Sequence, residues 1–258
     1  MRRVGKTTLI REFCKGKKAI YFAALETTQG ENLASLSKEV FENTMPGTPM
    51  PSFTSFEELL DYIYPLAKEE RQVLLIDEYP YLAQSYRPIS SIIQNQIDLR
   101  FRETKLFLIL CSSSLSFMEN QVLGYKSPLY GRRTAQFKIR PFTYKGSALM
   151  LADFPKEEQA ILCGITGAIP DNLGKIEPHL SLKENICELF LTPSGSLFEE
   201  PNNLLKQELR DPATYNAVIA AIAGGASRLN EIATKVGIGT SACSNLLISL
   251  IAMGLVKK

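Results

Sequence analysis

The sequence predicts an α/β fold in which helices cover both faces of a parallel sheet. Continuous apolar runs of strand length occur at residues 19–25, 72–77 and 105–111, and such runs are typical of strands covered on both faces. Segments with helical spacing separate these runs, and strands that alternate with helical crossovers favour a parallel sheet. Ligands of such sheets bind at the carboxyl ends of the strands, so the residues that follow each run are candidates for a site.

Helices are expected wherever apolar residues recur at every third or fourth position. They span about residues 6–15, 31–43, 55–68 and 89–102. The third of them opens with Ser55 and Glu58, which have the spacing of a capping box. A turn is expected at residues 79–81, and a shorter fourth strand at residues 137–140, where Pro141 ends it.

The chain beyond residue 142 predicts two helical regions. The first is irregular, and the second contains three helical segments, at about residues 215–223, 228–236 and 241–253. A short turn at residues 237–240 separates the last two segments, which is the layout of a helix-turn-helix. We therefore expect three domains, at residues 1–142, 143–212 and 213–258.

The composition describes an ordinary globular protein. Of its 258 residues, 45% are hydrophobic and 22% are charged, and the net charge of +2 suggests no particular partner. The apolar runs fall far short of the roughly 20 residues that span a bilayer, and the first residues lack the apolar region that a signal peptide requires, so we expect none. We expect a cytoplasmic protein that does not enter a membrane. Five scattered cysteines without a C-x-x-C pair, and a single histidine, predict reduced thiols rather than a zinc site.

The first motif that carries chemistry lies at the start of the first helix. Gly5-Lys6-Thr7 fits the back half of a phosphate-binding loop, G-x-x-x-x-G-K-[ST]. In such a loop, backbone N–H groups hold phosphates, the lysine reaches the β and γ oxygens, and the hydroxyl holds Mg²⁺. The nucleotide-binding residues expected here are Arg3, Val4, Gly5, Lys6, Thr7 and Thr8. The alternative is a chance Gly-Lys-Thr run in a turn.

The second motif is Asp77-Glu78, at the end of the buried run 72–77. In a nucleotide hydrolase, Asp77 together with Thr7 holds Mg²⁺, and Glu78 orients or deprotonates the attacking water. The alternative is an acidic pair that merely caps and solvates the end of a strand. Because the two motifs occur together, about seventy residues apart, they predict descent from a nucleotide hydrolase.

Three further residues are candidates for catalysis. Ser113 follows the third apolar run, where it would hydrogen-bond the attacking water or the γ-phosphate. The alternative is that the serine cluster at residues 112–114 caps a helix that begins near Leu115. Arg132 and Arg133 precede the fourth expected strand, where a guanidinium would meet the charge that develops on phosphate; the alternative is a solvated basic loop.

The last helical segment bears on nucleic-acid binding. It is where a helix-turn-helix carries its base-reading residues, yet residues 241–253 contain no Arg or Lys and are apolar over most of the circumference. Since neutralisation of phosphates drives DNA affinity, we expect weak or no DNA binding and packing of this helix inside the protein.

These motifs together resemble the archaeal and prokaryotic AAA+-related ATPases of the STAND class, over most of the chain. The resemblance rests on residues 2–13, 74–78, 108–114 and 128–133. Residues 166–170 are similar to the family's Gly-Gly-Ile-Pro segment, whose proline, here Pro170, packs by the nucleotide base. Ala168 stands where the family has its second glycine.

The resemblance implies a P-loop sheet, ATP or ADP as ligand, Mg²⁺ as cofactor, and a C-terminal winged helix that closes over the nucleotide as a switch. A protein partner or self-association is also implied, and many members carry a further nuclease-like domain. In the family a central strand and a glycine precede the residue that is Met1 here, and a wing follows Lys258. We therefore expect a sheet that lacks its first strand, and a chain truncated at both ends.

Two hypotheses follow for function. The first is a Mg²⁺-dependent ATPase domain that acts as a nucleotide-driven switch. Poor ATP binding and slow or absent hydrolysis are expected of it, because the loop glycine and the strand are lacking. The alternative is a degenerate protein that binds a partner or DNA without hydrolysing a nucleotide.

Overall fold

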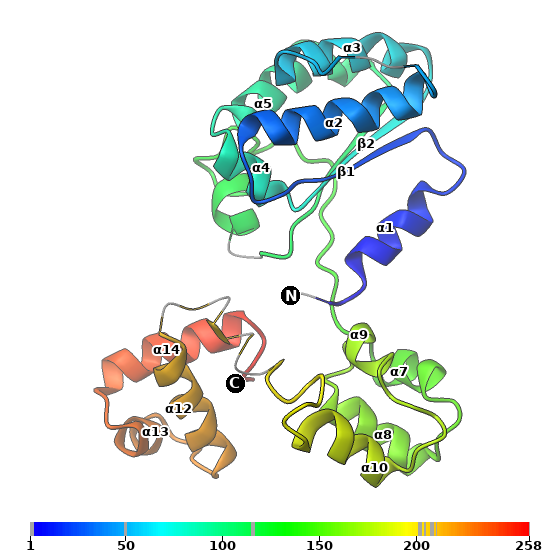
Figure 1. The fold of residues 1–258 in the computed structure, drawn as a ribbon. Helices are drawn as coiled ribbons and strands as arrows, with labels where there is room; N and C mark the ends of the chain where they lie inside the picture. The colour runs from blue at the N-terminus through cyan, green and yellow to red at the C-terminus, as the bar shows by residue number, and fades with distance from the viewer. Residues whose placement is uncertain are drawn as a thin grey trace. The chain divides into compact units, whose positions relative to one another are not determined.

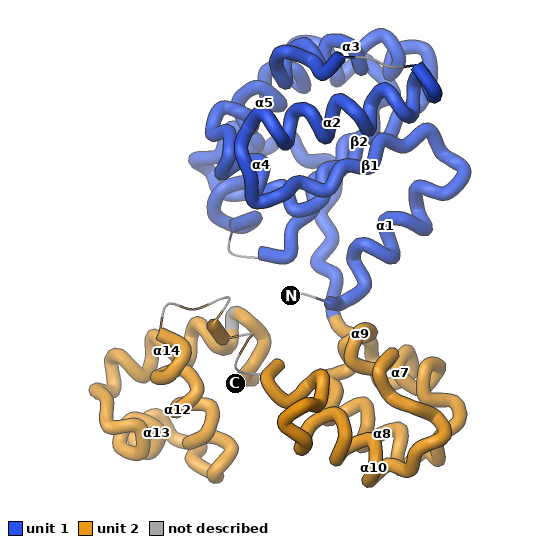
Figure 2. Tube along the Cα trace, in the orientation of Figure 1, with its two compact units in different colours: residues 1–140 blue, residues 141–258 orange. Residues whose placement is uncertain are grey.

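A computed structural model describes residues 3–257, apart from 49–50, 115–116, 201–202, 204, 207–208 and 210. The chain forms two compact units, Met1–Arg140 and Pro141–Lys258 (Figure 2). The first unit holds the sheet, and the second is helical.

Three parallel strands form the sheet of the first unit (Figure 1). They are β1 (Ala19–Ala23), β2 (Gln72–Asp77) and β3 (Leu106–Leu110), in the order β1-β2-β3. The expected parallel sheet is confirmed, and each strand lies within two residues of its predicted bounds. Ala23 pairs with Asp77 and Ile76 with Leu110, so the three strands end at the same edge.

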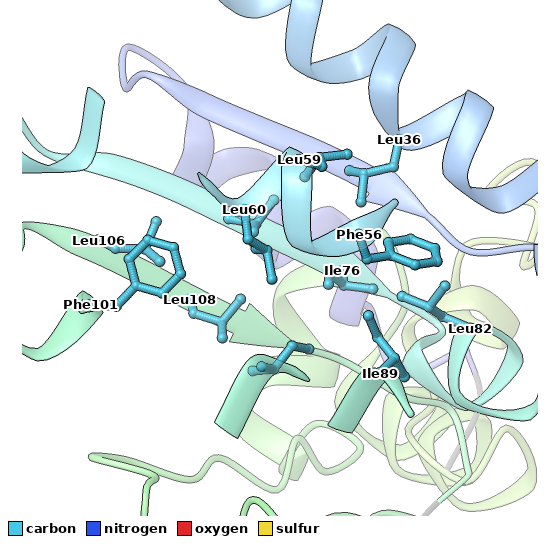
Figure 3. Close-up of a pocket in the computed structure, with 12 residues that line it drawn as sticks. Leu36, Phe56, Leu59, Leu60, Ile76, Leu82, Ile89, Phe101, Leu106 and Leu108 are labelled. Atoms are coloured by element: carbon cyan, nitrogen blue, oxygen red, sulfur yellow. The ribbon is translucent and has the colours of Figure 1, made fainter. Parts of the chain in front are cut away.

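One face of this sheet is covered by four helices. They are α2 (Gln29–Thr44), α3 (Phe56–Glu69), α4 (Tyr79–Ser85) and α5 (Ile89–Leu99), the last followed by the 3-10 turn η1 (Phe101–Glu103). Leucine, isoleucine and phenylalanine side chains of the helices pack against Ile76, Leu106 and Leu108 of the strands (Figure 3). The void left among them is about 20 Å³, the room of about one water molecule, so this apolar core is no ligand site.

The opposite face of the sheet is covered by α1 (Lys6–Cys14). The ring of Phe13 lies 5.6 Å from that of Phe107 on β3, and the guanidinium of Arg11 lies 5.5 Å from the ring centre of Tyr21 on β1. All nine residues of α1 are described and none is buried, so this helix has less packing than the other four.

Two local predictions are wrong. The segment 79–81 does not form a turn, because Pro80 occupies the first turn of α4, where proline needs no N–H donor. The segment 137–140 is not a strand of the described sheet, and its Phe137 is 83% exposed. The predicted strand contains only four residues, two of them charged, and it lacks the paired neighbour that a strand requires.

The second unit contains two helical cores. Helices α7 (Tyr144–Met150), α8 (Lys156–Ile165), α9 (Pro170–Leu173) and α10 (Leu182–Ile186) accompany a core that includes Leu151, Leu162 and Leu173. Helices α12 (Pro212–Ala223), α13 (Leu229–Val236) and α14 (Thr240–Ala252) surround Val218, Ile232, Cys243 and Leu250. Gly237 ends α13 in the left-handed region, with φ 75°, so the three helices and the turn expected here are present. The described part of the chain also contains two π-helical turns, η2 (Met118–Val122) and η3 (Cys187–Leu191).

Among the described residues, no helix combines the length and the apolar character needed to span a bilayer.

Candidate nucleotide site

The N-terminus of α1 is available to an anion. Gly5 forms the N-cap with φ 83° and ψ 16°, a left-handed conformation that favours glycine, and no described side chain caps this end of the helix. Val4, the residue before Gly5, is buried and only 4% exposed. Arg3 has a left-handed φ of 61°. Helix N–H groups without a side-chain cap, at the positive end of the helix dipole, attract phosphate.

The side chains of α1 reach the carboxyl ends of both neighbouring strands. Lys6 Nζ donates a hydrogen bond to the carbonyl oxygen of Ser112, which follows β3. Thr7 Oγ1 donates to Oδ2 of Asp77 at the end of β2, at 3.2 Å, while the next residue, Thr8, is exposed. The fold thus brings together the two motifs of the sequence, which lie seventy residues apart.

Asp77 is the buried centre of this site. Its side chain belongs to a residue only 6% exposed, and three donors hold its carboxylate. Oδ2 accepts hydrogen bonds from Thr7 and, at 2.9 Å, from the hydroxyl of Tyr21, and Oδ1 accepts one from the backbone N–H of Glu78 at 3.0 Å. A buried carboxylate needs such donors, since an unpaired buried charge is strongly destabilising.

Sequence reasoning missed Tyr21. It lies on β1 and pairs with Leu75, which is two residues before Asp77 on β2, and in the sequence it is one member of an apolar run. Burial first, and then the hydrogen bond to Asp77, raise the pKa of Tyr21 to about 12, so the hydroxyl stays protonated at neutral pH. The sequence signal that could have identified Tyr21 is its hydroxyl group, which is out of place in an otherwise apolar run.

Glu78 has an unusual backbone conformation. Its φ of 48° and ψ of 44° are left-handed, which is uncommon for a residue other than glycine, and it forms the N-cap of α4. Both the backbone N–H and Oγ of Ser113 donate to Oε2 of Glu78, at 3.1 and 2.9 Å. Glu78 and Ser113 also line an open pocket with Tyr81, Gln84 and Asn120.

The capping role that was the alternative for Ser113 is taken in part by Ser114. Ser114 Oγ accepts a hydrogen bond from Phe117 N at 3.3 Å, and the residues between them, including Leu115, lie outside the described part of the chain.

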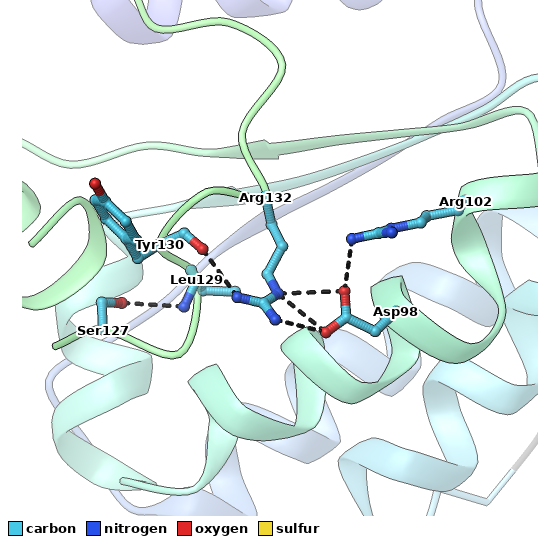
Figure 4. Close-up of polar contacts among 6 residues, drawn as sticks. All are labelled: Asp98, Arg102, Ser127, Leu129, Tyr130 and Arg132. Atoms are coloured by element: carbon cyan, nitrogen blue, oxygen red, sulfur yellow. Dashed lines mark hydrogen bonds and ion pairs between the residues drawn. The ribbon is translucent and has the colours of Figure 1, made fainter. Parts of the chain in front are cut away.

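The two candidate arginines have different surroundings. Arg132 makes a two-pronged contact with Asp98 of α5, through Nε and Nη2 at 3.0 and 2.7 Å, and donates to the carbonyl oxygen of Tyr130 (Figure 4). Arg102 also binds Asp98, at 3.0 Å. Arg133 is exposed and donates to Gln136 at 2.6 Å. Neither guanidinium has a described contact with Lys6, Thr7 or Asp77.

Pro170 begins α9 in the second unit. Before it, Gly167 and Ala168 have left-handed φ angles of 64° and 55°. A left-handed conformation costs roughly 1–2 kcal/mol for an L-residue with a Cβ, so Ala168 occupies a position that favours glycine. The relation of Pro170 to the site on the first unit remains a prediction.

Comparison with known proteins agrees with this geometry. Residues 1–176 match the family described as ATPase domains predominantly from Archaea. The chain belongs to this family of archaeal ATPase domains. It is a P-loop ATPase domain by family, and nucleotide binding follows from that membership.

Two proteins of Methanocaldococcus jannaschii are relatives of this ATPase domain. The uncharacterized protein MJECL04 is 30% identical over 260 residues, which cover 100% of this chain and 56% of that protein. The uncharacterized protein MJ0424 is 36% identical over 77 residues, 30% of this chain and 67% of that protein. The chain thus spans about half the length of the first of these relatives.

Among solved structures, the Walker-type ATPase paby2304 of Pyrococcus abyssi has a similar fold. Its TM-score is 0.72 at 20% sequence identity, and the match covers 97% of this chain and 82% of that one. At this identity the likeness supports the fold of the ATPase domain alone.

Proposed function

We propose that this ATPase domain hydrolyses ATP with the help of Mg²⁺ at the site formed by α1 and the ends of β2 and β3. One observation carries the proposal. Lys6 and Thr7, adjacent on α1, contact residues 106 and 70 positions away, at the ends of two neighbouring strands. A phosphate-binding lysine, a hydroxyl and a buried carboxylate therefore meet at the edge of a parallel sheet where ligands bind.

In this proposal the helix terminus and Lys6 bind the phosphates. The ammonium of Lys6 exchanges the carbonyl oxygen of Ser112 for oxygens of the β- and γ-phosphates, which are stronger, charged acceptors. The N–H groups of the first turn of α1, from Gly5 to Thr8, add further donors along the helix dipole.

The oxygens of Thr7 and Asp77 fit Mg²⁺, because this ion prefers hard oxygen ligands and few protein carboxylates. When bound, Mg²⁺ neutralises charge on the β- and γ-phosphates. Thr7 and Asp77 would hold it, directly or through water. The hydrogen bond between Thr7 and Asp77 already brings the two side chains together beside the N-terminal turn of α1.

Glu78 acts on water in this proposal. Ser113 holds one oxygen of the Glu78 carboxylate, so the other oxygen can accept a proton from water. Ser113 is thus a positioning residue for Glu78. Arg132 and Arg133 belong to the proposal as groups that bind phosphate charge, and Arg132 must leave Asp98 to do so.

The finer family assignment is also part of the proposal. We infer a switch of the STAND class, in which α12, α13 and α14 form the helices of a winged helix and Pro170 packs by the base. We expect ATP to bind weakly and to turn over slowly, since no residue of α1, which is described in full, is buried. Ordering a loosely packed segment costs about 1–2 kcal/mol per residue.

Glu78→Gln tests the proposed chemistry. The variant keeps the shape of the side chain but loses the base, so ATP binding should persist while turnover falls about 10²–10⁴-fold. Initial rates of phosphate release and calorimetric titration measure the two quantities. Glu12→Gln, an exposed change on α1, is the control. Equal, measurable turnover of Glu78→Gln and the parent would exclude Glu78 as the base. Absence of turnover in the parent itself would favour the alternative of a protein that binds a partner or DNA without hydrolysing a nucleotide.

A further inference from the structure

We propose that Tyr21 is a positioning residue that orients the carboxylate of Asp77 toward a divalent cation. This inference rests on the function proposed above, because it assigns Asp77 to a metal. The observation that carries it is the hydrogen bond from the Tyr21 hydroxyl to Oδ2 of Asp77, at 2.9 Å. It is shorter than the 3.2 Å bond from Thr7 to the same oxygen.

The hydrogen bonds of Asp77 leave little freedom to its carboxylate. A carboxylate has about four lone-pair sites. Tyr21 and Thr7 fill two on Oδ2, and the N–H of Glu78 fills one on Oδ1. Among the hydrogen bonds of the described residues, the remaining site is on Oδ1, the oxygen that Tyr21 does not touch. The two hydroxyls thus turn Oδ2 toward β1 and α1, and they leave Oδ1 to accept a cation or its water.

Tyr21 is suited to this role because it belongs to the sheet. Its backbone lies in the β1 ladder opposite Leu75, whereas Thr7 lies on the thinly packed helix α1. The guanidinium of Arg11 lies 5.5 Å from the centre of its half-buried ring. A donor fixed by a strand retains its position when Thr7 rearranges to meet a ligand. Partners of this kind typically change metal affinity about 10–100-fold when they are removed.

Tyr21→Phe removes the hydroxyl and leaves the ring. Tyr62→Phe is a matched control, because the Tyr62 hydroxyl is also partly buried and bonds a threonine, Thr44, at 3.0 Å, away from the site. Both variants lose one hydrogen bond, so both should melt at a slightly lower temperature than the parent. If Tyr21 had a purely structural role, Tyr21→Phe would show this loss of stability and no other effect.

The decisive measurement is the Mg²⁺ dependence of nucleotide binding. The melting temperature is followed during a Mg²⁺ titration at a fixed, high concentration of a non-hydrolysable ATP analogue, and again with analogue and EDTA. In Tyr21→Phe, the Mg²⁺ concentration at the midpoint of the titration should rise about tenfold. The rise in melting temperature that the analogue causes in EDTA should match that of the parent. In Tyr62→Phe the midpoint should stay at the parental value.

The outcomes separate this inference from the function on which it rests. A parental midpoint in Tyr21→Phe overturns the role of Tyr21 but leaves the Mg²⁺ site standing. Equal midpoint shifts in Tyr21→Phe and Tyr62→Phe likewise overturn it, since the effect would then reflect stability alone. If the parent itself gains no stability from Mg²⁺ in the presence of the analogue, the metal assignment fails together with the inference.

Discussion

The contacts of individual side chains explain how the site is held. Glu78 keeps a left-handed backbone that costs of order 1–3 kcal/mol, and such strain persists where the surroundings fix it. Here the backbone N–H of Glu78 donates to the carboxylate of Asp77, and the hydroxyl of Ser113 donates to the carboxylate of Glu78. The sequence predicted each of these residues separately, because each belongs to a recognisable motif.

The partners of the motif residues were not predictable from the sequence. Tyr21 meets Asp77 through the register of β1 on β2, and Asp98 meets Arg132 across 34 residues. No local pattern encodes either pairing, since each depends on how separate elements pack. Strand register and helix packing therefore determine which partners the motif residues contact.

Arg132→Ala should lower the melting temperature more than Arg133→Ala. Arg132 is mostly covered and binds both oxygens of Asp98, whereas Arg133 is exposed. The Arg132 guanidinium also holds the pKa of Asp98 below its usual range. A carboxyl with a lowered folded-state pKa stabilises the fold above its unfolded pKa, about 4, and this gain disappears as pH falls through the folded value.

Melting curves of both variants at neutral and acidic pH check this prediction. The difference between Arg132→Ala and the parent should be largest near neutral pH and should shrink below about pH 4. An equal loss in Arg133→Ala at neutral pH would refute the structural role of the Arg132–Asp98 pair.

At the scale of elements, continuous apolar runs located β1, β2 and β3 because burial on both faces is recorded locally in a strand. The segment 137–140 failed because a strand also needs a hydrogen-bonded neighbour, and no local sequence supplies one. The turn predicted at residues 79–81 was wrong because Pro80 lies in the first turn of α4, and proline is as compatible with the start of a helix as with its end.

Helix α14 carries a prediction at this scale. It has no Lys or Arg, so the domain should bind DNA weakly and without sequence preference, if at all. Gel-shift titration at physiological salt should give dissociation constants no tighter than about 10⁻⁶–10⁻⁴ M. Sub-micromolar binding that depends on the DNA sequence would contradict the assignment of α14 to packing.

At the scale of the whole molecule, the chain joins an ATPase unit and a helical unit in one polypeptide. Family membership covers residues 1–176, which include the complete first unit and part of the second. The relative MJECL04 extends well beyond the matched length, since the match covers 56% of it. The nucleotide site on the first unit is the feature that the whole account requires.

Calorimetric titration of the Lys6→Ala variant with Mg·ATP tests that feature most directly. Lys6 is the ammonium at the N-terminus of α1, so its loss should weaken ATP binding at least tenfold, about the contribution of one charge-assisted hydrogen bond. Lys15→Ala, an exposed change at the other end of the helix, is the control and should bind ATP like the parent. If Lys6→Ala binds ATP with parental affinity, the phosphates do not lie on α1, and the site described here is not the nucleotide site.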